Sequence, residues 1–159
     1  MRYGALLAAV VFLLDRGSKQ WILGLREAGA LPIEVTPFFN LVFTWNRGIT
    51  FGLFNQRGTE GADVGRWLLI AVTGAIVIGL LVWLFRAKGW RLLLALGLVI
   101  GGAIGNLVDR VVHGAVADFL DFHLMGYHWY VFNIADAAIV CGVGLLLLDS
   151  LLARPKEPR

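Results

Sequence analysis

The stretch that decides the fold is WLLIAVTGAIVIGLLVWLF at residues 67–85, which contains no charged residue. A helix that crosses the hydrocarbon core of a bilayer needs about 20 predominantly apolar residues. Comparable stretches lie on both sides of it, and we expect transmembrane spans at residues 3–25, 67–85, 92–109 and 129–150. This pattern predicts an all-α integral membrane protein with four transmembrane helices.

The composition of the whole chain agrees with a membrane protein. Of its 159 residues 58% are hydrophobic and only 16% are charged, which is more apolar surface than a soluble domain of this length could bury. We expect a single domain over residues 1–159. The first apolar run superficially resembles a signal peptide, but Asp15 closes it and no cleavage site precedes a soluble sequence, so we expect a retained first helix.

The basic residues predict the orientation in the membrane. By the positive-inside rule, the side with more basic residues faces the cytoplasm. This side holds both termini and the tail at residues 153–159, while residues 26–66 and 111–128 are external. No basic run is interleaved with aromatic residues as binding of single-stranded nucleic acid requires, so we expect no nucleic-acid partner. The residues on the cytoplasmic side are Arg2, Arg86, Lys88, Arg91, Arg154, Lys156 and Arg159.

The external segments should carry some structure, because the first is too long for a simple connection. The β-branched and aromatic residues LVFTW at 41–45 predict a short strand. Phe51, Leu53 and Phe54 follow as a short amphipathic segment that offers an apolar face to the membrane surface and could cover a site. The second segment is polar, and we expect a solvated loop without a metal ion to hold the histidines His113, His123 and His128.

Two aspartates, Asp118 and Asp136, lie among apolar residues near the external ends of predicted spans. A carboxylate at the centre of a bilayer costs about 2.5–3.5 kcal/mol, so such a residue commonly has a task. Two carboxyls that share one proton provide the chemistry of an aspartic protease. The spacing alone leaves two alternatives open: Asp136 could cap the amino end of the fourth span, and Asp121 could replace Asp118.

Polar residues on two of the spans could surround such a pair. Asp15 and Lys19 are four residues apart and predict an ion pair on one helix face. Such a pair could position a group at the site, but we favour a structural ion pair with Lys19 extended toward the membrane interface. Asn106, Asp109 and Arg110 share one face of the third span and should line a cavity.

Glycines and amides occur at three further positions of interest. Gly101 and Gly105 form a GxxxG pattern that allows close helix packing. Asn46 and Gly48 follow the predicted strand in a pattern that is by itself typical of a turn. Asn133 precedes Asp136 by three residues and could form a hydrogen bond to the same site.

Five motifs of the chain, taken together, resemble the bacterial lipoprotein signal peptidase family, also called signal peptidase II. In order they are DRGSK at residues 15–19, NRG at 46–48, GGAIGNLVDR at 101–110, VADF at 116–119 and FNIAD at 132–136. The resemblance implies that Asp118 and Asp136 are a catalytic dyad, and it favours Asp118 over Asp121. It also implies substrate-binding or supporting positions for Asn46, Gly48, Asn106, Arg110, Asn133, Asp15, Lys19 and Asp109.

The resemblance further implies an intramembrane aspartic endopeptidase of the bacterial inner membrane, with its site near the external face. Its substrate would be a prolipoprotein, cleaved just before a cysteine that carries a diacylglyceryl group, without a metal or an organic cofactor. The partners that we expect are this substrate and membrane lipid, and we expect a monomer. Arg16 stands where the family often has Gln, and Ile49 and Thr50 where it commonly has alanines, so we expect changes in substrate fit and not in activity.

The alternative of a different class is a small proton-coupled transporter or channel subunit, which would also use acids within the membrane. Four short spans without paired inverted halves speak against it.

Overall fold

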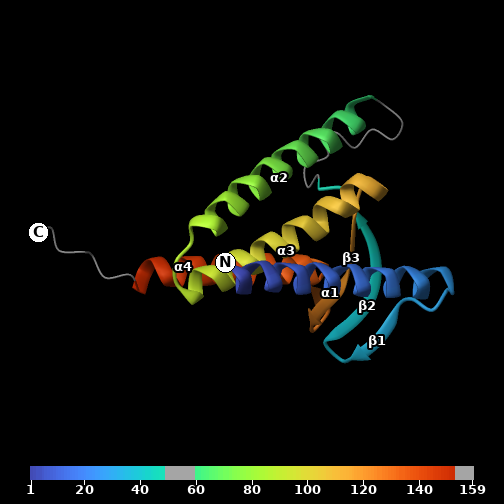
Figure 1. Cartoon of the computed structure of the whole chain (residues 1–159). Coiled ribbons are helices and arrows are strands. Elements are labelled where there is room, and N and C mark those ends of the chain that lie inside the picture. Colours follow the sequence, from blue (N-terminus) through green and yellow to red (C-terminus); the bar gives the residue numbers. More distant parts are fainter. Residues whose placement is uncertain (49–59, 153–159) are drawn as a thin grey trace, which may run out of the picture.

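The computed structural model describes residues 1–48 and 60–152, which form long helices and one small antiparallel sheet (Figure 1). The elements are α1 (Arg2–Glu27), β1 (Ile33–Thr36), β2 (Phe39–Asn46), α2 (Glu60–Arg86), α3 (Trp90–His113), β3 (Val116–Leu124), β4 (Tyr127–His128) and α4 (Ile134–Leu152).

Three helices, α2, α3 and α4, are long and apolar enough to cross a membrane. The fourth, α1, is 26 residues long, but it contains Asp15, Arg16 and Lys19 in its middle. The expectation of apolar spans is thus confirmed for these three helices, whereas charged residues interrupt the apolar run of α1.

The central helix is α3, which packs against the other three helices. Its glycines let it approach them closely, as the GxxxG pattern predicts. A Cβ atom on Gly101 would lie 2.6 Å from the carbonyl oxygen of Ala8 in α1, and one on Gly105 would overlap the carboxyl group of Asp15. On the opposite face, a Cβ atom on Gly102 would overlap the carbonyl oxygen of Ala135 in α4. The polar end of α3 is therefore held between α1 and α4.

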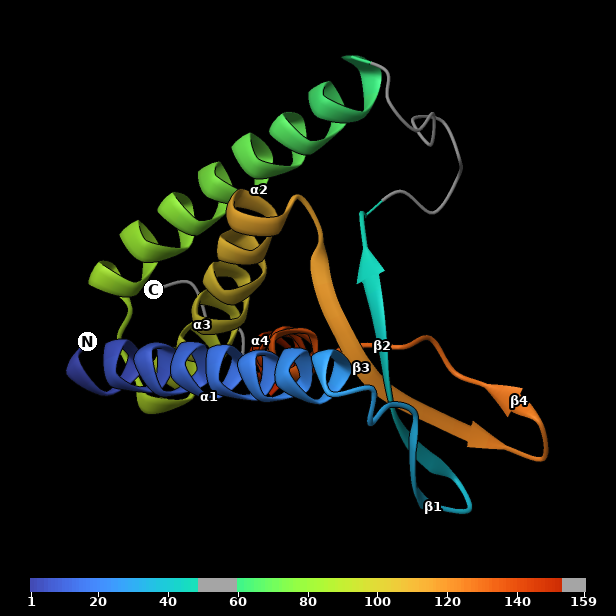
Figure 2. The ribbon, with the colours of Figure 1, turned by 90° about the vertical axis from the view of Figure 1, so that its right-hand side faces the viewer.

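The sheet lies at one end of the helices, where α1 and α3 end and α4 begins (Figure 2). Its strand order is β1-β2-β3-β4, with every neighbouring pair antiparallel. Thr44 of β2 pairs with Asp118 of β3, and Asn46 pairs with Val116. This register brings the end of β2 to the first acidic residue of β3.

Two expectations about the external side were wrong. Residues 111–128 are not a polar loop, because β3 runs through them with Val116–Phe119 buried. The fourth helix begins at Ile134 and not at residue 129. The residues before it follow β3 instead, since the amides of Phe119 and Leu120 both donate to the carbonyl oxygen of Phe132, over 3.0 and 2.8 Å.

The strand predicted at residues 41–45 is confirmed and forms part of β2. The sheet is larger than the single strand that we expected. The predicted amphipathic segment with Phe51, Leu53 and Phe54, the departures at Ile49 and Thr50, and the tail at residues 153–159 lie outside the described residues.

Candidate active site

Asp118 lies in β3 and is 1% exposed. Its two carboxyl oxygens accept hydrogen bonds from different elements: Oδ2 from Asn46 Nδ2 over 2.9 Å, and Oδ1 from Asn133 Nδ2 over 2.6 Å. Burial raises the pKa of Asp118 to about 6; the bonds from Asn46 and Asn133 oppose this rise and the charge of Asp136 adds to it. Asp118 is thus a buried carboxyl that titrates close to neutral pH.

Asp136 lies in the first turn of α4 and forms a reciprocal cap with Asn133. The Asp136 amide donates to Asn133 Oδ1 over 2.9 Å, and the Asn133 amide donates to Asp136 Oδ2 over 3.3 Å. This is the geometry of a capping box, with Asn133 as the N-cap. The interpretation of Asp136 as a capping group is therefore confirmed in part, but its Oδ1 also accepts a bond from Asn106 Nδ2 over 2.7 Å.

Asn106 and Asn133 connect the two carboxyls, and their neighbours fix how their amides are turned. An ammonium group only donates, so Asn106 directs Oδ1 to Lys19 Nζ at 3.0 Å and its NH₂ group to Asp136. Asn133 Oδ1 accepts the bond from the Asp136 amide, which leaves its NH₂ group for Asp118. Each carboxyl consequently receives a side-chain amide N–H.

Lys19 lies at the centre of a second, fully buried cluster. It is 1% exposed, and Nζ lies 2.8 Å from Asp15 Oδ2 and 2.9 Å from Asp109 Oδ2 in addition to its bond to Asn106. The predicted pair with Asp15 forms, but Lys19 does not extend to the membrane interface, because three acceptors enclose its ammonium group.

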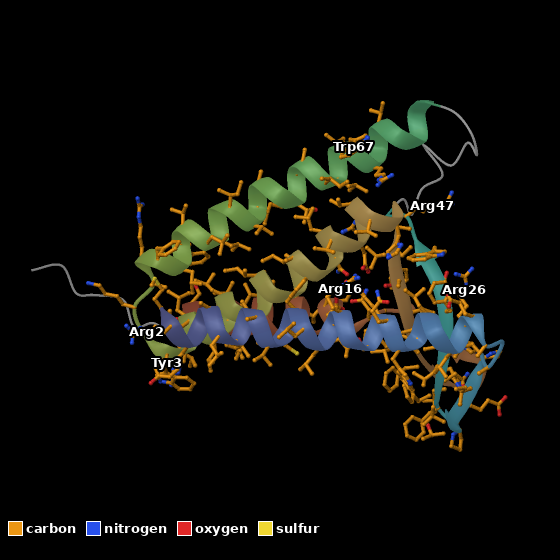
Figure 3. The ribbon with its side chains drawn as sticks, turned by 45° about the vertical axis from the view of Figure 1, so that its right-hand side comes forward. Arg2, Tyr3, Arg16, Arg26, Arg47 and Trp67 are labelled. Atoms are coloured by element: carbon orange, nitrogen blue, oxygen red, sulfur yellow. The ribbon has the colours of Figure 1, made fainter. Side chains whose placement is uncertain are left out.

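The same cluster supports the two aspartates through the backbone. Asp15 Oδ1 accepts a bond of 3.0 Å from the amide of Ala135, next to Asp136. Asp109 Oδ2 accepts one of 3.3 Å from the amide of Ala117, next to Asp118. Arg16 forms an ion pair with the other oxygen of Asp109. Figure 3 shows oxygen and nitrogen atoms gathered close to Arg16, between the ribbons of α1 and α3.

Arg110 completes the charges around the site. Its guanidinium group interacts electrostatically with both Asp136 and Asp118. Gly48, with φ +75°, lies near this guanidinium group: a Cβ atom on Gly48 would lie 3.7 Å from Arg110 Nη2. Three cations (Arg16, Lys19 and Arg110) thus accompany four carboxyls (Asp15, Asp109, Asp118 and Asp136), so the cluster is neutral when one carboxyl holds a proton.

Asp121, the rival of Asp118, has different partners. Residues three apart on a strand point to opposite faces. Its carboxyl accepts a bond of 3.4 Å from Asn40 Nδ2 and lies 3.0 Å from His128 Nδ1. The structure therefore brings Asp118, and not Asp121, to the residues that hold Asp136.

The histidines do not converge. His123 and His128 stack at 4.8 Å, whereas His113 lies against Trp45 at 5.1 Å. Within residues 1–48 and 60–152, no group of three His, Cys, Asp or Glu side chains is arranged to hold a metal ion.

A cavity of ≈ 470 Å³ lies beside Asp136. Asn46 and Asp136 line its polar end, and Val140 and Cys141 line it along α4. The sequence predicts a cavity lined by Asn106, Asp109 and Arg110, but none of the three lines this one. The sequence also did not indicate Tyr130, which lines the cavity and whose Oη accepts a bond of 2.8 Å from Asn46 Nδ2. An aromatic residue near a membrane interface has an ordinary anchoring role, so its sequence position carries no signal of this contact.

Comparison with known proteins identifies similar chains over nearly the whole length. The family described as Signal peptidase (SPase) II matches residues 7–152. A lipoprotein signal peptidase of Methylorubrum extorquens (strain PA1) is 48% identical over 158 residues, covering 99% of this chain and 90% of that protein. One of Rhodopseudomonas palustris (strain TIE-1) is 43% identical, with coverages of 98% and 95%.

Solved structures agree with these matches. A structure described as a bacterial membrane enzyme, determined by the in meso method at 1.9 Å resolution, is 28% identical with a TM-score of 0.76 and covers 97% of this chain and 96% of that one. A second such structure, at 2.3 Å resolution, has a TM-score of 0.74 and covers 100% and 96%.

Proposed function

We propose, from the premise that this chain belongs to the signal peptidase II family, that Asp118 and Asp136 are its catalytic pair. The family match gives the activity as that of a peptidase that processes lipoproteins, and so decides against the transporter interpretation. The observation that carries the residue assignment is the position of Asn133. Its side-chain NH₂ group donates to the Asp118 carboxyl and its backbone amide donates to the Asp136 carboxyl, so one residue binds two carboxyls that come from different elements.

The pair activates water for attack on a peptide bond. Two close carboxyls do not both ionise easily, and the neutral charge balance of the cluster favours one shared proton. The ionised member takes a proton from a water molecule bound between them, and this water attacks the scissile carbonyl carbon. The protonated member donates to the carbonyl oxygen as the tetrahedral intermediate forms. Because the proton belongs to the pair, neither aspartate is assigned a fixed role.

Arg110 adds positive charge on the same side. Among the described residues its buried Nε has no hydrogen-bond partner. A buried donor without a partner costs roughly 1–3 kcal/mol, so a substrate carbonyl oxygen at this position would be bound favourably. Lys19, Asp15 and Asp109 act indirectly, by fixing Asn106 and the backbone next to each aspartate.

All four helices cross the membrane in this proposal. A helix of 26 residues is about 39 Å long, enough for the hydrocarbon core. The polar residues of α1 do not oppose the crossing, because Asp15 and Lys19 are buried and Arg16 pairs with Asp109. With both termini cytoplasmic, the sheet and the catalytic pair lie at the external side of a bacterial inner membrane, in a single monomeric domain over residues 1–159.

The substrate is a prolipoprotein whose cysteine carries a diacylglyceryl group. The cavity beside Asp136 follows α4 as far as Val140, which is 70% exposed on the face that lipid would cover. A substrate held by its own lipid chains can reach this opening sideways from the bilayer. Neither a metal ion nor an organic cofactor takes part in the reaction.

The test is a processing assay on a diacylglyceryl-modified prolipoprotein with Asp118→Asn and Asp136→Asn measured separately. Each substitution keeps the size of the side chain and removes the charge. We expect cleavage by each variant to fall to background, while the unmodified precursor is not processed even by the wild type. Substantial cleavage by either variant would exclude the dyad.

A further inference from the structure

Tyr130 is held firmly at the edge of the candidate active site. The residues on both sides of it are bound to β3: the Trp129 amide donates to the Phe122 carbonyl over 2.7 Å, and the Phe132 amide donates to the Leu120 carbonyl over 3.1 Å. Tyr130 therefore belongs to a segment fixed to the same strand that carries Asp118.

Asn46 links Tyr130 to the catalytic pair, and each of its side-chain hydrogens already has a partner. Its NH₂ group has two hydrogens, which go to Asp118 Oδ2 and to Tyr130 Oη. Its Oδ1 accepts a bond of 2.8 Å from the amide of Gly48. Asn46 lines the cavity beside Asp136, and these contacts make it in addition a positioning residue for Asp118 and Tyr130.

The hydroxyl group of Tyr130 is thereby directed to donate. Since Oη accepts the bond from Asn46, its own hydrogen points elsewhere, and the hydrogen bonds among residues 1–48 and 60–152 include none that Tyr130 donates. The side chain lines the cavity beside Asp136 and is 60% exposed, so a bound molecule can reach it. A single oriented donor in a largely apolar pocket is a common source of specificity.

We propose that Tyr130 is a specificity residue, whose hydroxyl group donates a hydrogen bond to a carbonyl oxygen of the bound substrate. This inference rests on the proposed function, because it assumes that the substrate occupies the cavity beside Asp136. Two groups of a lipid-modified substrate supply such an oxygen: the peptide backbone next to the cleaved bond and the ester linkage of the lipid. Tyr130 does not touch the reacting water and takes no part in proton transfer.

The test compares Tyr130→Phe with Tyr127→Phe in the full-length protein. Tyr127 lies three residues earlier, is 75% exposed and does not line the same cavity, so the control makes the same chemical change away from the site. Loss of one hydrogen bond should lower kcat/KM of Tyr130→Phe by roughly three- to tenfold, through a higher KM with kcat little changed. Tyr127→Phe should match the wild type.

A second substrate identifies which carbonyl is bound. One synthetic lipopeptide carries the lipid through ester bonds and another through ether bonds, which lack the carbonyl oxygen. A penalty for Tyr130→Phe on the ester substrate alone would support the lipid ester, and an equal penalty on both would support the peptide carbonyl.

The inference would be overturned if Tyr130→Phe matched Tyr127→Phe on both substrates while Asp118→Asn was inactive, a result that leaves the proposed function intact. It would also be overturned if Tyr130→Phe lowered kcat and the unfolding temperature together with KM unchanged, since that is the behaviour of a structural residue. Cleavage by Asp118→Asn at the wild-type rate would instead contradict the proposed function.

Discussion

Replacing Lys19 by methionine should strongly destabilise the protein, although the side chain lies in a helix and keeps its length. The ammonium group is 1% exposed and lies within 3.0 Å of Asp15, Asp109 and Asn106. Removing one partner of a buried ion pair costs roughly 3–5 kcal/mol, because the remaining charge is left uncompensated. Among residues 1–48 and 60–152, Asp109 keeps Arg16 as a partner, while Asp15 keeps only the backbone amide of Ala135. We therefore expect a loss near the lower end, about 3 kcal/mol.

The assay is thermal unfolding of the purified protein in detergent. For chains of 150–250 residues, 1 kcal/mol corresponds to about 2–4 °C, so Tm should fall by about 6–12 °C. Lys88→Met is the matched control, because Lys88 is exposed between α2 and α3. Adding Asp15→Asn to Lys19→Met should restore part of the loss, since it removes the uncompensated charge. If Lys19→Met unfolded within about 2 °C of Lys88→Met, the buried cluster would not have the role assigned to it.

Two further predictions concern protonation and packing. Because the pKa of Asp118 is about 6 and the active pair holds one proton, kcat/KM should fall as pH rises through about 6. Asn46→Ala removes a hydrogen bond that favours the ionised carboxylate, so the pH at which kcat/KM falls should become higher. An unchanged or lower pH for this fall would contradict the role of Asn46. Gly101→Ala should lower Tm, because the new Cβ would lie 2.6 Å from the Ala8 carbonyl oxygen. Gly74→Ala should be neutral or stabilising, because among the described residues no atom outside its own helix turn lies within 4 Å of the new Cβ. Equal Tm values for the two variants would argue against the tight contact between α1 and α3.

The sequence predicted those parts of the fold that depend on residues close together in the chain. The uncharged stretch at residues 67–85 lies within α2, and LVFTW at 41–45 lies within β2. Helical spacing placed Asn106 and Asp109 on one face, and both are buried there. The length and periodicity of a segment are enough to predict such features.

The features that were missed depend on neighbours far away in the chain. Asp118 and Asp121 interrupt the apolar pattern of β3, so its sequence alone does not predict a strand. Pairing with β2, which is distant in the chain, makes it one. The spacing of Asp15 and Lys19 predicts their ion pair but not the third helix that encloses it. Likewise the contact of Asn46 with Tyr130 joins residues 84 positions apart, and no local pattern reports it.

The most direct test of the central claim compares Asp118→Asn with Asp121→Asn, a second acid of the same strand, alongside Asp136→Asn. The measurement is the rate at which each purified variant cleaves a diacylglyceryl-modified prolipoprotein. The proposed site predicts background rates for Asp118→Asn and Asp136→Asn, and a rate close to the wild type for Asp121→Asn. Cleavage by Asp118→Asn together with its loss in Asp121→Asn would contradict the assignment of the catalytic pair.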